Sequence, residues 1–247
     1  MLAELRMETI LAELEKEQAV SVAQLCQVTG ASEATIRRDL NELARRGKLN
    51  KVHGGALPIR EEFRREEPNM EVKSQLHTPE KMRIARYAAG LITNDDVVYL
   101  DAGSTVMHMV EHIQAPNAIF VTNSVECAMR LPRRGLRAYV LGGVIKSGTL
   151  AVIGSQAVAG LKKYNFTKTF LGTNGIAVEP GFTTPDPEEA MVKAEAAVHA
   201  RETWVLADSS KFGISTAASV LPLGGARIVT DQLDDRRYLE YTDIKVV

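Results

Sequence analysis

Residues 21–57 read SVAQLCQVTGASEATIRRDLNELARRGKLNKVHGGAL, and this stretch decides the fold of the N-terminal part of the chain. Ser21, with Gln24 three residues later, has the pattern of a capping box, which begins a helix. Gly30 ends that helix, because glycine adopts a left-handed backbone at little steric cost. A second helix follows, and Gly54 and Gly55 then mark the turn of a short hairpin. This order predicts a winged helix-turn-helix, which places one helix in the major groove of DNA.

The two helices have an apolar side and a polar side. We expect one small core to contain Val22, Leu25, Val28, Ile36, Leu40 and Leu43, which recur at helical spacing. The other side presents residues that suit DNA, because arginine holds phosphate or guanine and asparagine can pair with adenine. The predicted DNA-binding residues of the second helix and the hairpin are Ser32, Thr35, Arg37, Arg38, Asn41, Lys48, Lys51 and His53.

An earlier helix, over about residues 2–17, is expected to pack beneath this pair through Leu5, Ile10, Leu11 and Leu14. Its charges are mostly acidic, whereas those of the second helix and the hairpin are mostly basic. The net charge of the whole chain is −1, so the overall composition does not indicate DNA binding. The positive field that would attract DNA comes from the second helix and the hairpin alone. A solvated surface helix would explain an isolated arginine pair, but the caps, turn and hairpin that accompany this pair favour DNA binding.

Composition limits the remaining function classes. The chain has 247 residues, which is enough for a second and larger domain. Its two cysteines, Cys26 and Cys127, are interpreted as small buried side chains in a reducing compartment, and they provide no disulfide framework. The sequence has no signal-peptide pattern and no membrane-length apolar run, so we expect a cytoplasmic protein without a membrane partner.

The predicted domains are a winged helix-turn-helix over residues 1–57, a linker over residues 58–79, and an α/β domain over residues 80–247. The linker is dense in mixed charge, with REEFRREE at residues 60–67, and reads as a spacer or a solvated helix. After a helix expected over residues 80–92, short apolar runs recur at residues 97–100, 119–121, 138–141, 169–171, 204–207 and 228–229. This alternation predicts a mostly parallel sheet that is covered on both faces.

Small and polar residues follow five of these runs, at residues 101–105, 122–124, 142–143, 172–175 and 208–211. Any one of them is typical of an ordinary turn. Ligands of parallel sheets, however, bind at the carboxyl ends of the strands, where all five tips meet. We therefore expect a small-ligand site there, with Ser104 and Thr105 near a helix start that suits phosphate.

The stretch SEATIRRDLNELARRGKLNKVHGGA, residues 32–56, resembles the signature of the DeoR family of bacterial sugar-operon repressors. The motifs LDAGST, VTNS, LGG, GTNGI and LADSSKFG, at residues 100–105, 121–124, 141–143, 172–176 and 206–213, resemble the same family. The resemblance implies a C-terminal sensor related to sugar-phosphate isomerases. It also implies an effector pocket formed by Lys73, Lys81, Asp101, Ser104, Thr105, Asn123, Asn174, Asp208 and Lys211.

Within that implied pocket, Lys81 and Lys211 suit a phosphate, and Asp101 and Asp208 suit sugar hydroxyls or hold a lysine in place. A solvated helix face would explain Lys73 and Lys81 equally well. Residues 183–186, TTPD, depart from the usual Thr-Asp step of the family. This departure leaves open the roles of the nearby residues Glu188, Glu189 and Lys193.

Together these observations predict a repressor of a carbohydrate-utilisation operon, relieved by a phosphorylated sugar or a related metabolite, with activation left open. Palindromic operators call for paired readers, so we expect a dimer or tetramer on double-stranded DNA. The alternative is an isomerase-like enzyme fused to a DNA-binding module, since Asp101, Asp208 and Lys211 are suitable acid-base groups. A DNA-organising protein without a ligand is disfavoured, because basic charge is confined to one segment.

No catalytic residue, cofactor or metal is predicted. His108 and His112 fall four residues apart, but the glutamate of the metalloprotease pattern does not follow the first of them, so we interpret them as a surface or interface pair.

Overall fold

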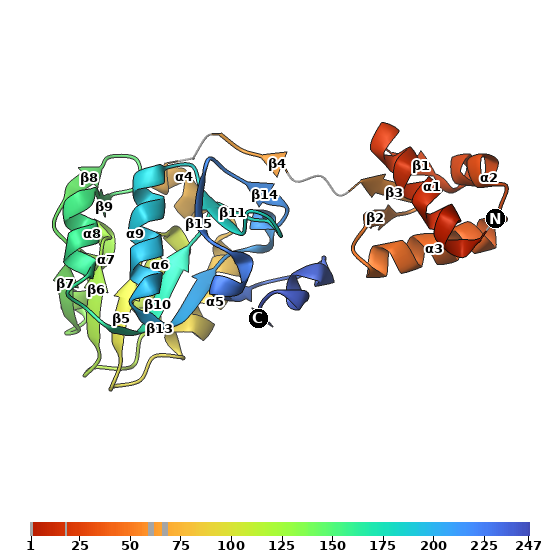
Figure 1. Cartoon of the computed structure of the whole chain (residues 1–247). Coiled ribbons are helices and arrows are strands. Elements are labelled where there is room, and N and C mark those ends of the chain that lie inside the picture. The colour runs from red at the N-terminus through yellow and green to blue at the C-terminus, as the bar shows by residue number, and fades with distance from the viewer. Residues whose placement is uncertain (1, 18, 59–61, 66–68) are drawn as a thin grey trace. The chain divides into compact units, whose positions relative to one another are not determined.

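The computed structural model describes residues 2–17, 19–58, 62–65 and 69–247. Its contacts group Met1–Glu61 with Asp235–Glu240 into one compact unit, and Glu62–Asp234 with Tyr241–Val247 into a second. We call them the N-terminal and the C-terminal unit and describe each by itself (Figure 1). In the described residues, every helix is too short or too polar to cross a membrane.

The N-terminal unit is a helix-turn-helix with a wing. Its elements are α1 (Ala3–Lys16), β1 (Val20–Ser21), α2 (Val22–Thr29), α3 (Glu33–Arg45), β2 (Leu49–Val52) and β3 (Gly55–Pro58). The strands form an antiparallel sheet in the order β1-β3-β2. The Ser21–Gln24 capping box begins α2, and Gly30 ends it with a φ of 69°. Gly55 lets β3 approach β1, because a Cβ there would collide with the carbonyl oxygen of Val20.

Two of the side chains expected in this core are exposed. Val28 is 47% exposed. The buried side of α2 instead continues from Val22 and Leu25 to Thr29, whose hydroxyl donates to the Leu25 carbonyl at 2.6 Å. Thr29 lies seven residues after Val22 and returns to the same face, whereas Val28 points about 100° away. Leu5 is also exposed.

The C-terminal unit is built on a seven-stranded sheet in the order β17-β16-β13-β10-β5-β6-β7, and all neighbouring strands are parallel. The strands are β5 (Val97–Leu100), β6 (Ile119–Thr122), β7 (Arg137–Val140), β10 (Phe166–Gly172), β13 (Ala200–Leu206), β16 (Arg227–Thr230) and β17 (Ile244–Val246). From β5 the chain moves outward to β7, and from β10 it moves outward to β17 on the other side. The pair β5–β10 is therefore the topological switch point of the sheet.

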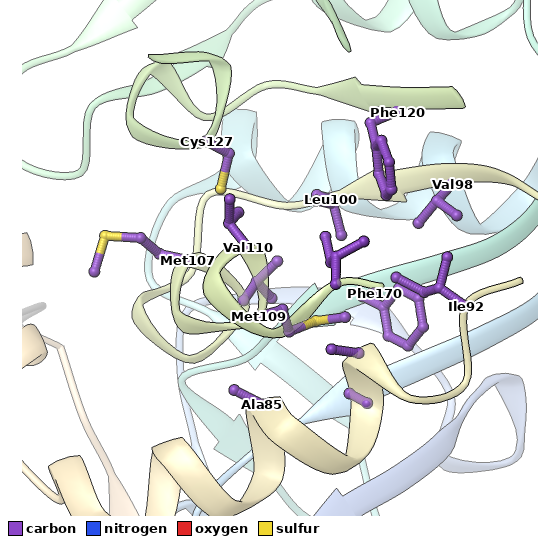
Figure 2. Packing of buried hydrophobic residues seen from close by; sticks show 14 of the residues in the cluster. Ala85, Ile92, Val98, Leu100, Met107, Met109, Val110, Phe120, Cys127 and Phe170 are labelled. Carbon is purple, nitrogen blue, oxygen red and sulfur yellow. The ribbon is translucent and has the colours of Figure 1, made fainter. Parts of the chain in front are cut away.

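Helices cover both faces of this sheet (Figure 1). On one face lie α5 (Thr78–Ala89), α6 (Ser104–Met109) and α7 (Val125–Arg133), and on the other lie α8 (Ser155–Leu161) and α9 (Pro187–Val198). Figure 2 shows the core on the first face, where Leu100 and Phe170 of the strands lie near Met109 of α6. The predicted combination of a winged helix-turn-helix with an α/β domain on a mostly parallel sheet is confirmed.

Several short elements complete the C-terminal unit. They are α4 (Met70–Gln75), the hairpin β8 (Val144–Lys146) with β9 (Ala151–Ile153), the sheet of β11 (Gly175–Ile176), β12 (Phe182–Thr184) and β15 (Ala218–Leu221), and the pair β4 (Glu62–Phe63) with β14 (Ile214–Ser215). Its 3-10 turns in the described residues span Val110–His112, Ser209–Lys211 and Leu223–Gly225, and a further 3-10 turn, Arg236–Glu240, is grouped with the N-terminal unit. The segment predicted as a linker thus contains β4 and α4. Residues 59–61 and 66–68 of that segment lie outside the described residues.

Candidate DNA interface and effector pocket

The polar side of α3 and the wing forms the candidate DNA interface. Of the eight residues predicted to contact DNA, Thr35 is half-buried and the other seven are exposed. Ser32 caps α3 by accepting from the Thr35 backbone N–H, and its hydroxyl lies 3.0 Å from the Thr35 hydroxyl. Arg38 is exposed, and Arg37 forms an exposed ion pair with Glu33 at 3.3 Å. Such an exposed pair is weak enough to open when the arginine meets a phosphate.

Two contacts hold this interface in place. Lys51 of the wing donates to Oδ1 of Asn41 on α3 at 2.6 Å, which joins the two parts of the interface. Behind α3, the guanidinium of Arg6 on α1 contacts both carboxylate oxygens of Asp39, with Nε 2.5 Å from Oδ2. Asp39 is buried, so this bidentate pair fixes α3 against α1. The sequence analysis did not predict this pair. Arg6 lies four residues before the buried Ile10, and therefore on the same face of α1.

A polar pocket opens at the switch point between β5 and β10. It is lined by Lys73, Lys81, Ala102, Gly103, Ser104, Thr105, Gly172, Thr173, Asn174, Glu189, Lys193, Leu206, Ala207, Asp208 and Lys211. The loops after β5, β10 and β13 supply most of these residues, while α4, α5 and α9 supply the remaining charged side chains. The pocket therefore lies where the sheet topology favours ligand binding.

Seven of the nine residues predicted for the effector line this pocket: Lys73, Lys81, Ser104, Thr105, Asn174, Asp208 and Lys211. Asp101 and Asn123 are buried outside the lining. Asp101 accepts from the Gly172 backbone N–H at 2.9 Å and from the ammonium group of Lys193. It thus holds a lysine in place. Asn123 donates to the carbonyl oxygen of Val152 at 3.2 Å, next to the hairpin β8–β9.

One end of the pocket is strongly cationic. Lys73 of α4, Lys81 of α5 and Lys211 after β13 line it together. Burial lowers the pKa of Lys81 to about 8, and Asp208 opposes this change. The neighbouring charges of Lys211 and Lys73 add to the lowering of that pKa. Burial is also the main cause that lowers the pKa of Lys211. Oδ2 of Asp208 is buried and accepts no hydrogen bond from the described residues.

Residues of α9 form the other end. Glu189, 6% exposed, accepts from the Thr149 hydroxyl at 2.7 Å and from the Lys146 ammonium group at 3.1 Å. Asp186 caps α9 by accepting from the backbone N–H groups of residues 188 and 189. The unusual TTPD step therefore ends in a helix cap. Glu189 and Lys193 are pocket residues whose roles the sequence left open. Their spacing of four residues could have indicated that they lie on the same face of one helix.

The histidine pair and the cysteines take no part in this pocket. His108 and His112 are half-buried, as is Cys26, whereas Cys127 is fully buried in the core. Burial is the main cause that lowers the pKa of His108. Within the described part of the chain, no three histidine, cysteine, aspartate or glutamate side chains stand close enough to hold a metal ion.

Family models match both units. Residues 6–62 match the DeoR-like helix-turn-helix domain, and residues 76–232 match the DeoR C-terminal sensor domain. The HTH-type transcriptional regulator FruR of Bacillus subtilis (strain 168), which is described as uncharacterized, is 41% identical over all of this chain and 99% of its own length. The HTH-type transcriptional repressor GlcR of the same organism is 30% identical over 98% of this chain and 94% of its own length.

Among solved structures, ribose 5-phosphate isomerase A of Methanocaldococcus jannaschii matches 53% of this chain and 53% of its own, with a TM-score of 0.39 and 17% identity. That likeness is too weak to bear on function. The two family models and the relatives that match along the whole chain confirm the resemblance read from the sequence. The chain belongs to the DeoR family of DNA-binding helix-turn-helix transcriptional regulators.

Proposed function

We propose that the chain represses a carbohydrate-utilisation operon in the cytoplasm, as a dimer or tetramer, and that a phosphorylated sugar or a related metabolite relieves repression by binding the pocket. The observation that carries this proposal is the division of the pocket into a cationic end and an end with mixed charges and amides. A lactose phosphotransferase system repressor of Staphylococcus epidermidis is 31% identical over 93% of this chain, which supports a role in sugar metabolism.

The cationic end suits the phosphate. Lys81 and Lys211 are ammonium groups on flexible stems, and ammonium groups bind phosphate as compact point charges. The hydroxyls of Ser104 and Thr105 line the same pocket and can donate to phosphate oxygens. Both lysine ammonium groups lose solvent on burial, so a bound dianion would restore favourable electrostatic surroundings.

The opposite end suits hydroxyl groups of a sugar. Asn174 and Thr173 offer both donors and acceptors, Glu189 offers acceptors, and Lys193 offers a donor held by Asp101. A hydroxylated carbon chain offers both donors and acceptors to such a mixed polar lining, whereas an apolar ligand offers neither. The two ends together favour a ligand with one anionic and one hydroxylated part.

The DNA-binding residues of α3 and the wing would read a palindromic operator as pairs, one module for each half-site. Relief of repression then requires that the ligand binds more tightly to the arrangement of the chain that releases the operator than to the arrangement that holds it. A hundredfold loss of operator affinity needs a coupling free energy of about 2.7 kcal/mol, which is within the usual range for allostery.

We infer that the pocket acts as a sensor and not as an isomerase site, because the relatives that match the whole chain are named transcriptional regulators and repressors. The alternative enzyme would use Asp208 and Lys211 as acid and base. Both possibilities are tested by incubating the full chain with sugar phosphates. Thermal stabilisation and operator release without turnover support the sensor, whereas steady conversion of aldose to ketose phosphate would support the enzyme.

A ligand screen by thermal shift tests the proposed chemistry directly. It compares phosphorylated sugars, the matching free sugars and inorganic phosphate on the full chain. We expect the phosphorylated sugars to raise the melting temperature most, because they alone fill both ends of the pocket. If the free sugars raise the melting temperature as much as the phosphorylated sugars do, the cationic end does not bind a phosphate.

A further inference from the structure

An apolar strip runs along one edge of the C-terminal unit. It consists of Tyr139 and Val140 of β7 and Val144 and Ile145 of β8, which are 38%, 56%, 67% and 55% exposed. The exposed residues Gly142 and Gly143 connect the two strands, and β7 and β8 lie at the same edge of the sheet (Figure 1). Four large exposed apolar side chains within seven residues contrast with the single exposed side chains that are normal on protein surfaces. Because successive side chains of a strand alternate between its faces, Tyr139 and Val140 flank the outer edge of β7 from both faces of the sheet.

The strand β7 is the last strand of the parallel sheet. Its outer backbone N–H and C=O groups therefore face away from β6 and can pair with another strand. Soluble proteins usually protect such an edge with charges, prolines or bulges. Here the four apolar side chains stand in two pairs, at residues 139–140 and 144–145. The charged residues that flank them in the sequence are Arg137 and Lys146, and Lys146 is ion-paired with Asp186 and Glu189.

The opposite edge of the same sheet is different. The strand β17 reads Ile244-Lys245-Val246, so a lysine stands at its centre, and the Lys245 ammonium group lies 5.5 Å from the centre of the Tyr87 ring. A central charge of this kind prevents edge-to-edge pairing. The two edges of one sheet thus differ in the feature that decides whether a strand can be joined.

We propose that a second copy of this chain docks on the β7–β8 strip, with the two β7 strands antiparallel across a two-fold axis. An antiparallel pair of identical edge strands is self-complementary, as a closed two-fold interface requires. This names the surface for the self-association that the proposed function includes, and it does not depend on the effector.

The area of the strip fits this occupant. The four side chains expose roughly 400 Å² of apolar surface, a size typical of association sites. A standard interface buries about 800 Å² on each partner, so the strip supplies about half of that area as the apolar centre. The exposed Arg137 side chain, whose guanidinium lies 5.4 Å from the centre of the Tyr139 ring, would belong to the polar rim.

The test is sedimentation velocity of the full chain over a wide concentration range. The double variant Val140→Lys/Val144→Lys places lysines on the strip, and Val246→Lys is the matched control, because Val246 is an exposed valine on the other edge of the same sheet. We expect the double variant to dissociate about a hundredfold more readily than the unchanged chain, while the control keeps its assembly. Circular dichroism and the melting temperature verify that each variant is folded, and the single Val144→Lys variant substitutes if the double variant is not.

Three results would overturn the proposal: a monomeric unchanged chain, a strip variant with unaltered assembly, or a control that dissociates as much as the strip variant. Binding of duplex DNA is measured on the same samples. A monomer that still binds DNA would refute this interface and leave the transcriptional role intact, so the two failures are distinguishable.

Discussion

The hydroxyl of Thr149 donates to Oε1 of Glu189 at 2.7 Å, and this bond joins the loop of the β8–β9 hairpin to the pocket wall. Both side chains are buried, and Lys146 contacts the same carboxylate oxygen from the hairpin at 3.1 Å. A ligand that contacts Glu189 therefore meets a carboxylate whose position is fixed by the hairpin.

This relationship predicts the effect of Thr149→Val. The variant keeps the shape of the side chain but removes the donor, so Glu189 is held less firmly and a buried acceptor loses a partner. We expect calorimetry to show effector affinity about tenfold or more lower, with operator affinity in the absence of effector unchanged. Unaltered effector affinity would show that the hairpin does not position Glu189.

The second prediction concerns the exposed face of α3. Arg38→Ala should weaken operator binding by about 1–3 kcal/mol if the guanidinium contacts a base. The matched control is Arg86→Ala, which removes the same charge from an exposed position on α5 of the other unit. Gel-shift titrations at several salt concentrations check the result. Equal effects of the two variants would indicate a loss of general charge and no specific contact.

The third prediction concerns pH. The pKa of Lys81 is lowered to about 8, principally by burial, so the ammonium group loses its proton as the pH rises through that value. A phosphate ligand should then bind up to about tenfold more weakly at pH 9 than at pH 7, where Lys81 is charged. Lys81→Arg should flatten this profile because arginine stays protonated. A profile in the unchanged chain that is flat between these pH values would exclude Lys81 from the phosphate site.

The fourth prediction tests the core of the N-terminal unit. Leu40 is 1% exposed in that core, so Leu40→Ala should destabilise the unit by about 2–5 kcal/mol. Val28→Ala, at the exposed position, should change its stability by less than about 0.5 kcal/mol. Hydrogen exchange resolves the two units and should show the loss of protection in α1, α2 and α3 of the N-terminal unit, with the C-terminal unit unchanged. Similar costs for both variants would contradict the packing described here.

Sequence patterns located the main strands because each of them contains a short apolar run that is followed by turn residues. The strand β17 was missed because Lys245 interrupts its apolar character, and β8 and β9 were missed because three-residue strands are too short to show a period. Val28 was assigned to the core because spacings of three and four are both compatible with a helix face. In the structure the buried residue is Thr29, which lies seven residues, or about two helical turns, after the buried Val22.

The pocket was predictable at the strand tips and less so on the helices. Ser104, Asn174 and Asp208 each lie within four residues of the end of a strand, so the sheet rule brings them to one edge. Lys193 is different, since its partner Asp101 lies 92 residues away in the sequence. Local spacing contains no information about that contact, which arises only when α9 packs against the sheet.

The central claim is that occupancy of the pocket controls release of the operator. The most direct measurement titrates the effector identified by thermal shift into the operator complex and follows release, for the unchanged chain and for Lys211→Ala. We predict that both bind the operator equally well without effector, and that the variant needs at least about tenfold more effector for half-release. If the variant releases the operator at the same effector concentration as the unchanged chain, the pocket does not control DNA binding.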